Sequence, residues 1–339
     1  MKPSQTTCFI ILGIVSLSAA LQTKHYVEWF PSYGYIFDEV ARDECVLEHT
    51  DYLTGMKDGV PFTGRPTTLA NRVVSCVLKR VTENVKANTA AAAVLLGLLP
   101  TVLGLAGSST AEMGILAHHR PLLAFILALG SPVVSPTRAF EFQNPKKLLE
   151  ADEDELMPLP KLRGRWAVVV SALQYVVAAA AAGNIIHIGL ELGIKAVCSF
   201  APDTVYLPLL WSLTAVLLNA LGALFIYLRL KFVRAVPDAA HEAGRWDWIK
   251  REGGLSMLQP TMAMRQKTKT YFSVLVSWST STFTILHLIF GTLVLSCTLF
   301  VAVPDALAIA GRFFGSMVVC RAIVVFEFSG LKGKFPVKS

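Results

Sequence analysis

Long apolar blocks constrain this chain more than any other feature of its sequence. The five longest blocks each hold about 20 residues or more, enough for a helix that crosses the ~30 Å hydrocarbon core of a bilayer. We therefore predict an all-α fold, a polytopic membrane helix bundle over residues 88–328. Its firm spans are 88–107, 166–190, 205–228, 271–303 and 306–328. A mean hydropathy of +0.53 also indicates contact with lipid rather than a soluble domain.

Lysine and arginine are unevenly distributed between the apolar blocks, and this bias predicts the orientation of the bundle. The connections 138–165 and 229–270 carry six and nine of these residues, whereas 191–204 carries only Lys195. We expect the two basic connections and the basic tail 329–339 to be cytoplasmic, and hence a cytoplasmic C-terminus. The net charge of +7 is spread over these connections, which indicates attraction to the lipid surface and excludes nucleic acid as a partner.

The first residues have the three-part layout of a secretory signal. Lys2 precedes an apolar core, and small residues up to Ala20 precede a polar step. The apolar block 8–21 has 14 residues and would reach only about 21 Å as a helix, which is short for a span. We expect a signal peptide at 1–20, cleaved after Ala20, and a location in the secretory pathway or plasma membrane. An uncleaved anchor is the alternative.

A proline-marked segment at 121–137 is the doubtful crossing. Its apolar part is again short, and two of its prolines disrupt helix geometry. A full crossing would place residues 21–87 in the cytoplasm, whereas a segment that turns back would leave them outside, as a cleaved signal requires. Four Lys or Arg at 69–87 against one at 108–120 favour a full crossing. The shortness and the prolines favour a turn, and we expect residues 21–87 to be extracytoplasmic.

Residues 21–87 have the composition of aqueous structure, and we expect a short, irregular segment there. From Thr68 onward, apolar residues recur at helical spacing while basic residues mostly fill the other face. This pattern predicts an amphipathic helix that lies on the bilayer and runs into the first span. A helix that docks a partner has the same pattern.

Cysteine usage depends on the same side assignment. Cys45 and Cys76 both lie in the segment 21–87, and an oxidising compartment would favour a disulfide between them. Cys198 and Cys297 are expected near the same face of the membrane and are the rival partners.

A short helix is predicted just before the proline-marked segment. Ser109 and Glu112 stand at the spacing of a capping box, which indicates a helix start. His118 and His119 end this helix beside Arg120. Because adjacent residues on a helix point about 100° apart, one metal ion rarely binds both histidines, and we interpret the group as a polar cluster at headgroup level.

Polar side chains inside the predicted spans form the candidate functional site, because ionisable groups in hydrocarbon are costly. They are His187, Asn219, His287, Arg312, Arg321 and Glu327. Plain structural roles are also open: Arg321 and Glu327 can snorkel to the cytoplasmic surface, and Asn219 can donate a hydrogen bond to another helix. Arg312 and Arg321 are nine positions apart, about 180° around a helix, so they cannot both face one pore.

Signatures of known enzyme classes are missing from the chain. It contains no G-x-S-x-G, no H-E-x-x-H and no G-x-x-x-x-G-K, and its acidic run at 152–155 is interpreted as a solvated charge run. We expect no catalytic residue, metal or cofactor, and no haem at His187 or His287. The leading hypothesis is a non-enzymatic membrane protein that acts through packing or membrane-protein partners. A small-molecule transporter or channel is the alternative, followed by a membrane oxidoreductase.

One region resembles a known group of proteins. Within residues 76–144 the strings ENVKAN, GLLPTVLGL, STAE, RPLLAFILALGSP and PTRAFEF are similar to a recurrent block in uncharacterised multi-pass membrane proteins of filamentous fungi. The resemblance implies a signal-like start and a cysteine-bearing outer segment. It implies no activity.

Overall fold

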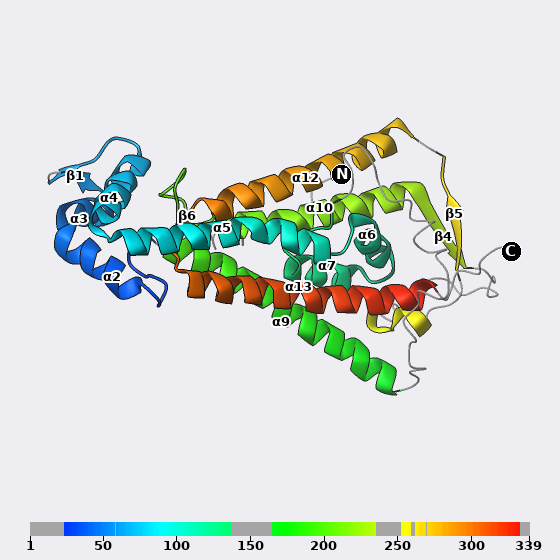
Figure 1. Ribbon diagram of the computed structural model, residues 1–339. Coiled ribbons are helices and arrows are strands. Elements are labelled where there is room, and N and C mark those ends of the chain that lie inside the picture. The colour runs from blue at the N-terminus through cyan, green and yellow to red at the C-terminus, as the bar shows by residue number, and fades with distance from the viewer. Residues whose placement is uncertain are drawn as a thin grey trace.

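The structure, a computed structural model, is an elongated bundle of helices with a smaller helical domain at one end (Figure 1). It describes residues 24–57, 59–136, 165–234, 252–258, 262–268 and 270–332. The expected signal peptide 1–20, the acidic run 152–155 and the end of the tail 329–339 lie outside the described residues.

Five long apolar helices form the bundle and confirm the predicted all-α polytopic fold. They are α5 (Glu83–Ala106), α9 (Arg165–Lys195), α10 (Leu207–Arg229), α12 (Tyr271–Ser296) and α13 (Val303–Lys332). Each is long and apolar enough to cross a membrane. α12 ends before its apolar block does, because the chain turns into strand β6 (Thr298–Leu299), which pairs with β3 (Val197–Cys198).

Apolar side chains from α5, α9, α10 and α13 interlock in the middle of the bundle. Trp211 on α10 and Phe313 on α13 are fully enclosed, with their ring centroids 5.9 Å apart. α5 and α13 start at the same end of the bundle, where the backbone N–H of Val303 donates to Asn88 Oδ1 at 2.9 Å. These two helices therefore run in the same direction, side by side (Figure 1).

The described residues that follow α5, up to residue 136, form two short helices and an extended segment. This elbow, residues 108–136, consists of α6 (Thr110–His119), α7 (Pro121–Gly130) and the extended residues 131–136. α7 has 10 residues, about 15 Å, or half of the ~30 Å hydrocarbon core. The N–H of Ser135 donates to the carbonyl of Ser108 at 3.0 Å, so the chain after α7 returns to the level at which α6 begins.

Local sequence explains both ends of the elbow helices. The predicted capping box is confirmed: Ser109 Oγ accepts from the Glu112 N–H at 3.2 Å, and Glu112 Oε2 accepts from the Ser109 N–H at 2.8 Å. Pro121 starts α7, where its missing N–H costs nothing. At the other end, a Cβ on Gly130 would lie 2.7 Å from Cys320 Sγ, so only glycine allows α7 to approach α13 this closely.

Residues 24–82 form a compact domain, called here the head, against one end of the bundle (Figure 1). It contains α2 (Gly34–Glu39), the π-helix η1 (Val40–Glu44), α3 (Val46–Thr54), β1 (Met56–Lys57), β2 (Val60–Pro61) and α4 (Pro66–Arg80). Phe300 from the α12–α13 connection enters the head, 5.2 Å from the Phe37 ring. The expectation of an irregular segment was wrong, because aromatic and valine side chains give the head its own core.

The amphipathic helix predicted from Thr68 exists as α4, but its placement on the bilayer was wrong. Leu69, Val73 and Val77 are buried against the core of the head. α4 ends at Arg80, and the first long helix, α5, follows at Glu83. An amphipathic pattern shows that one helix face is covered, and here the chain itself covers that face.

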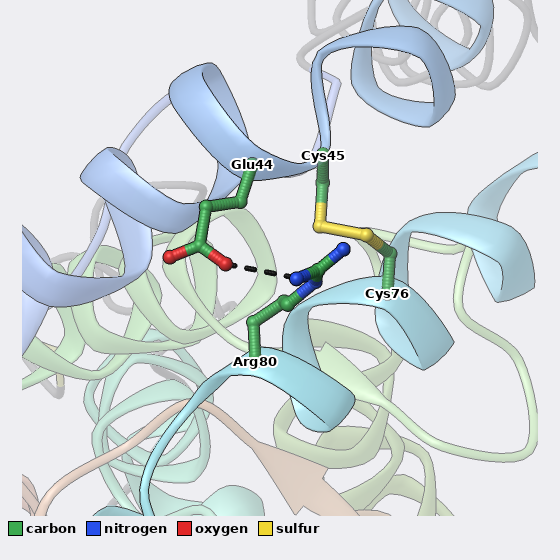
Figure 2. Close-up of a disulfide and its surroundings, with 4 residues drawn as sticks. All are labelled: Glu44, Cys45, Cys76 and Arg80. Carbon is green, nitrogen blue, oxygen red and sulfur yellow. Dashed lines mark ion pairs between the residues drawn. A yellow bond between two sulfur atoms is a disulfide. The ribbon is translucent and has the colours of Figure 1, made fainter.

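A disulfide ties α4 to the start of α3 (Figure 2). It joins Cys45 to Cys76, whose Cα atoms are 6.0 Å apart. Glu44 and Arg80 form an ion pair beside it, with Oε2 and Nε 3.5 Å apart. The covalent link and the ion pair hold the two halves of the head together.

The opposite end of the bundle carries a two-stranded antiparallel sheet and a short inserted segment. Strands β4 (Leu230–Arg234) and β5 (Met262–Gln266) pair antiparallel and extend beyond α10 (Figure 1). Residues 252–258, which include the 3-10 helix η3 (Ser256–Leu258), fold back against α13, where a Cβ on Gly330 would lie 2.9 Å from the Met257 nitrogen.

Candidate functional site

A group of polar side chains, buried except for the half-buried Tyr175, lies where the elbow, α9, α13 and the segment 252–258 meet. We call it the elbow cluster; it consists of Arg120, Ser171, Gln174, Tyr175, Glu252, Ser256 and Glu327. Arg120 is the turn residue between α6 and α7, and its exposed fraction is 0%.

Each nitrogen of the Arg120 guanidinium contacts a neighbouring group. Nη1 lies 2.9 Å from Glu327 Oε1 and also donates to Gln174 Oε1 at 2.7 Å. Nη2 donates to Ser171 Oγ at 2.7 Å, and Nε donates to the carbonyl of Glu252 at 3.0 Å. The charge is therefore shared among α9, α13 and the segment 252–258, which all contact the elbow at this residue.

Glu327 is bonded as completely as Arg120. Its Oε1 accepts from Arg120 and from Gln174 Nε2, the latter at 2.7 Å. Its Oε2 accepts from both the hydroxyl and the backbone N–H of Ser256, the backbone bond being 3.1 Å. A buried ion pair is tolerated only when its remaining donors and acceptors are satisfied, and this pair meets that condition.

Glu252 adds a second carboxylate to the elbow cluster. Its Oε1 accepts from the Tyr175 hydroxyl at 2.6 Å and from the backbone N–H of Leu123 at 3.0 Å. Leu123 lies in the first turn of α7, whose free N–H groups favour an anionic partner. Glu252 Oε2 has no hydrogen-bond partner in the described part of the chain. The cluster thus contains one guanidinium and two carboxylates.

Two predicted site residues on α13, Arg312 and Arg321, lie outside this cluster and contact different helices. Arg321 Nη1 lies 2.6 Å from Glu112 Oε2 on α6. Arg312 Nη1 lies 2.8 Å from Glu191 Oε2 on α9, and its Nη2 is 3.0 Å from His187 Nδ1. Their nine-residue spacing predicts that the two arginine side chains leave α13 in different directions, as these contacts with different helices show.

His287 holds the end of the elbow. Its Nε2 is 3.0 Å from the carbonyl of Pro132, and its Nδ1 is 2.8 Å from Thr214 Oγ1. The imidazole also stacks on Trp211 with ring centroids 5.8 Å apart. Both ring nitrogens therefore serve contacts within the chain, while His187 belongs to the separate Arg312 group.

Asn219 does not make the expected bond to another helix. Its Nδ2 donates to the carbonyl of Ala215, one turn earlier on α10 itself, at 3.0 Å. The interhelical bond that the sequence left open for Asn219 is not the bond its Nδ2 makes, because the carbonyl of its own helix lies within reach.

The structure gives protein surroundings to two groups of charged or polar residues. Arg120 and His119 are enclosed, with exposed fractions of 0% and 2%. Arg321 and Glu327, for which snorkelling was one open role, are each paired with a residue from another part of the chain. These side chains are long enough either to reach the membrane surface or to pair within the bundle. The partners with which they pair lie far away in the sequence.

Sequence reasoning did not single out Gln174, Glu252 or Ser171. Gln174 is a polar residue within the apolar block 166–190, and that position was an available signal. Glu252 gave no signal, because it lies in a charged connection where most carboxylates are solvated.

In the described ranges, no three His, Cys, Asp or Glu side chains gather as metal ligands would. Comparisons with protein-family profiles, with curated proteins and with solved structures found no match to this chain. The membrane class of the protein therefore rests on its five long apolar helices.

Proposed function

We propose that this multi-pass membrane protein is not an enzyme and acts by presenting its head to a partner. The observation that carries the proposal is the pairing of arginines within the bundle. Arg120, Arg312 and Arg321 each have a carboxylate partner from another part of the same chain. Charges that neutralise one another tie elements together, and these three paired arginines are poor candidates for lining a solute path.

The proposal includes an orientation. Basic residues favour a cytoplasmic C-terminus, and α13 leads away from the end of the bundle that carries the head. The head also packs on Val197 and Phe300, which belong to the connections with few basic residues. Because α7 is too short to cross the membrane, these observations support an extracytoplasmic head. The protein would then enter the secretory pathway. The resemblance to multi-pass fungal proteins is compatible with this arrangement.

The surface of the head supports a binding role. Tyr35 on α2 and Leu47 on α3 are 69% and 75% exposed, although the head buries a complete core elsewhere. The head also carries basic side chains: Arg72, Lys79 and Arg80 of α4 line a shallow hollow of about 580 Å³, which Glu48 of α3 lines as well. Exposed aromatic and aliphatic side chains beside basic ones are typical of protein-binding surfaces.

Site-specific photocrosslinking in intact cells tests the proposal. A crosslinking amino acid at Leu47 should give discrete adducts with protein, whereas one at Leu217, which is 65% exposed on α10, should react with lipid. The yield of protein adducts at Leu47 should also fall when Tyr35 is replaced by Asp. An absence of protein adducts at Leu47, together with stabilisation of the purified protein by a small solute, would favour a transporter instead.

A transporter coupled to a cation is the second candidate, and one observation favours it. The elbow cluster has one carboxylate more than it has guanidinium groups, and Glu252 Oε2 has no partner among the described residues. Short helices and an extended segment within a bundle are also features of transporter sites. Reconstituted protein should then carry protons or a monovalent cation, and Glu252→Gln should abolish the flux while Glu48→Gln on the head should not.

A further inference from the structure

A hollow of about 230 Å³ lies between the elbow and α10. Residues of α6, α7 and α10 line it, and the room comes from small side chains: Ala117, Ala124, Ala128, Ala220 and Ala223. Phe125 and Leu217 also line the hollow, and their exposed fractions are 53% and 65%. Because exposed apolar side chains on a membrane-spanning bundle face lipid, the hollow is reached from the bilayer.

The polar residue of the hollow, Asn219, lies near the middle of α10. It stands 12 positions after Leu207, where the helix begins, which is about 18 Å along a helix of about 33 Å. A ~30 Å hydrocarbon core that this helix spans therefore has Asn219 about 10 Å or more from either edge. At this depth water is scarce, so polar groups must find their hydrogen bonds elsewhere.

The side-chain amide of Asn219 has an acceptor without a donor. Its Nδ2 donates to the carbonyl of Ala215 at 3.0 Å, and because that carbonyl can only accept, the amide keeps this orientation. Its Oδ1 has no hydrogen-bond partner among the described residues, although Asn219 is only 7% exposed. An amide oxygen buried without a donor is costly. A molecule in the hollow that carries a donor would remove this cost.

We propose that the hollow binds a lipophilic alcohol, which enters from the bilayer and donates its hydroxyl to Asn219 Oδ1. Apart from Asn219, the side chains that line the hollow are apolar, which suits an apolar body. An ammonium donor is unsuitable, because a charge at this depth is costly and no carboxylate lines the hollow.

The size of the hollow fits such a ligand. An apolar cavity of about 150 Å³ holds benzene, so this larger hollow accommodates a ring or a short stretch of chain, while the rest of the ligand stays among the lipids. The site lies in the bundle, so its ligand is independent of any partner of the head.

Photolabelling of the purified full-length protein in phosphatidylcholine vesicles tests the site. The probe is a long-chain alcohol with a diazirine near its hydroxyl. Its methyl ether, which has the same body but no donor, is the matched probe. Mass analysis of peptides should place the alcohol adducts on the parts of α7 and α10 that line the hollow. The alcohol should label them about two- to tenfold more than the ether, the range that one net hydrogen bond gives.

Three variants separate the acceptor from the space around it. Asn219→Leu removes the acceptor at similar volume and should reduce labelling by the alcohol to the level of the ether. Ala220→Phe fills the hollow from α10 and should remove labelling by both probes. Ala180→Phe adds the same ring on the exposed face of α9, outside the hollow, and should behave like wild type.

Any of three results would overturn the proposed site. They are equal labelling of the wild-type hollow by alcohol and ether, a preference for the alcohol that persists in Asn219→Leu, and an absence of adducts in the hollow with either probe. Thermal unfolding shows whether each variant is folded. If Asn219→Leu does not fold, the two probes on wild-type protein and on Ala220→Phe still decide the question.

Discussion

Arg120 Nη1 lies 2.9 Å from Glu327 Oε1, and both side chains are fully enclosed, although 207 positions separate them in the chain. The contact fixes the turn between α6 and α7 to the last third of α13. Because neither short helix can cross a membrane alone, their place in the bundle depends on such contacts. The pair thus explains how a proline-marked segment can stay inside a helix bundle.

Packing of α12 against α10 gives a first prediction. A Cβ at Gly291 would lie 2.2 Å from Nε1 of Trp211, which is fully enclosed, so Gly291→Ala should overpack the core. We expect it to lower the free energy of unfolding by about 1–3 kcal/mol. Gly311→Ala is the matched control, because nothing lies within 4 Å of its new Cβ. That helix position should tolerate or gain stability from alanine; equal effects of the two changes would contradict the packing described.

The head should lose stability in acid because of His25. Burial lowers the pKa of His25 below its ordinary value of 6.5, and the backbone of Thr204 and Ile194, with a smaller effect from the charge of Asp203, offsets only part of this shift. The unfolded chain therefore takes up a proton near pH 6.5 that the folded head resists. Stability is fully present above about pH 6.5 and falls as the pH drops below it, by up to about 1.4 kcal/mol per pH unit.

Limited proteolysis of the head at pH 7.5, 6.5 and 5.5 measures this loss. His25→Gln cannot take up the proton and should flatten the pH dependence between 6.5 and 5.5. His49→Gln, which changes a neighbouring imidazole of α3, is the control and should keep the dependence of the wild type. A His25→Gln head that becomes as sensitive in acid as the wild type would show that another group is responsible.

Processing of the N-terminus provides a prediction that links sequence to orientation. We expect the mature chain to begin after Ala20 and the head to face the extracytoplasmic side. Intact-mass measurement of protein purified from a eukaryotic host determines the first residue, and alkylation with a membrane-impermeant reagent after reduction determines the side of Cys45 and Cys76. A retained Met1 together with a head reached only from the cytoplasm would reverse the proposed orientation.

The long helices were predictable from the sequence because hydrophobic length alone determines them. The start of α6 was also predictable, since Ser109 and Glu112 are only three positions apart and satisfy each other locally. The length of an apolar block and a capping box are both local properties of the sequence, and the folded chain shows both.

Contacts that depend on distant partners were not predictable. The partners of Arg120 could not be named from the sequence, because Glu327, Gln174 and Ser171 lie on other helices. The apolar face of α4 would look the same in sequence whether lipid or the core of the head covered it. In each case the sequence showed a residue or helix face that needs a partner, but it did not show which part of the chain is that partner.

A double-mutant cycle at Arg120 and Glu327 tests the central claim, that the charges within the bundle are paired for structure. Unfolding of the full chain should be followed in mixed micelles for Arg120→Met, Glu327→Met and the double variant. Each single change leaves a buried charge alone and should cost about 3–5 kcal/mol, whereas the double change removes both charges and should cost much less than the sum. The exposed pair of Arg42 and Asp38 should show a coupling of only about 0–1 kcal/mol. Strong coupling at Arg120 and Glu327 is the predicted result; additive losses would contradict the account.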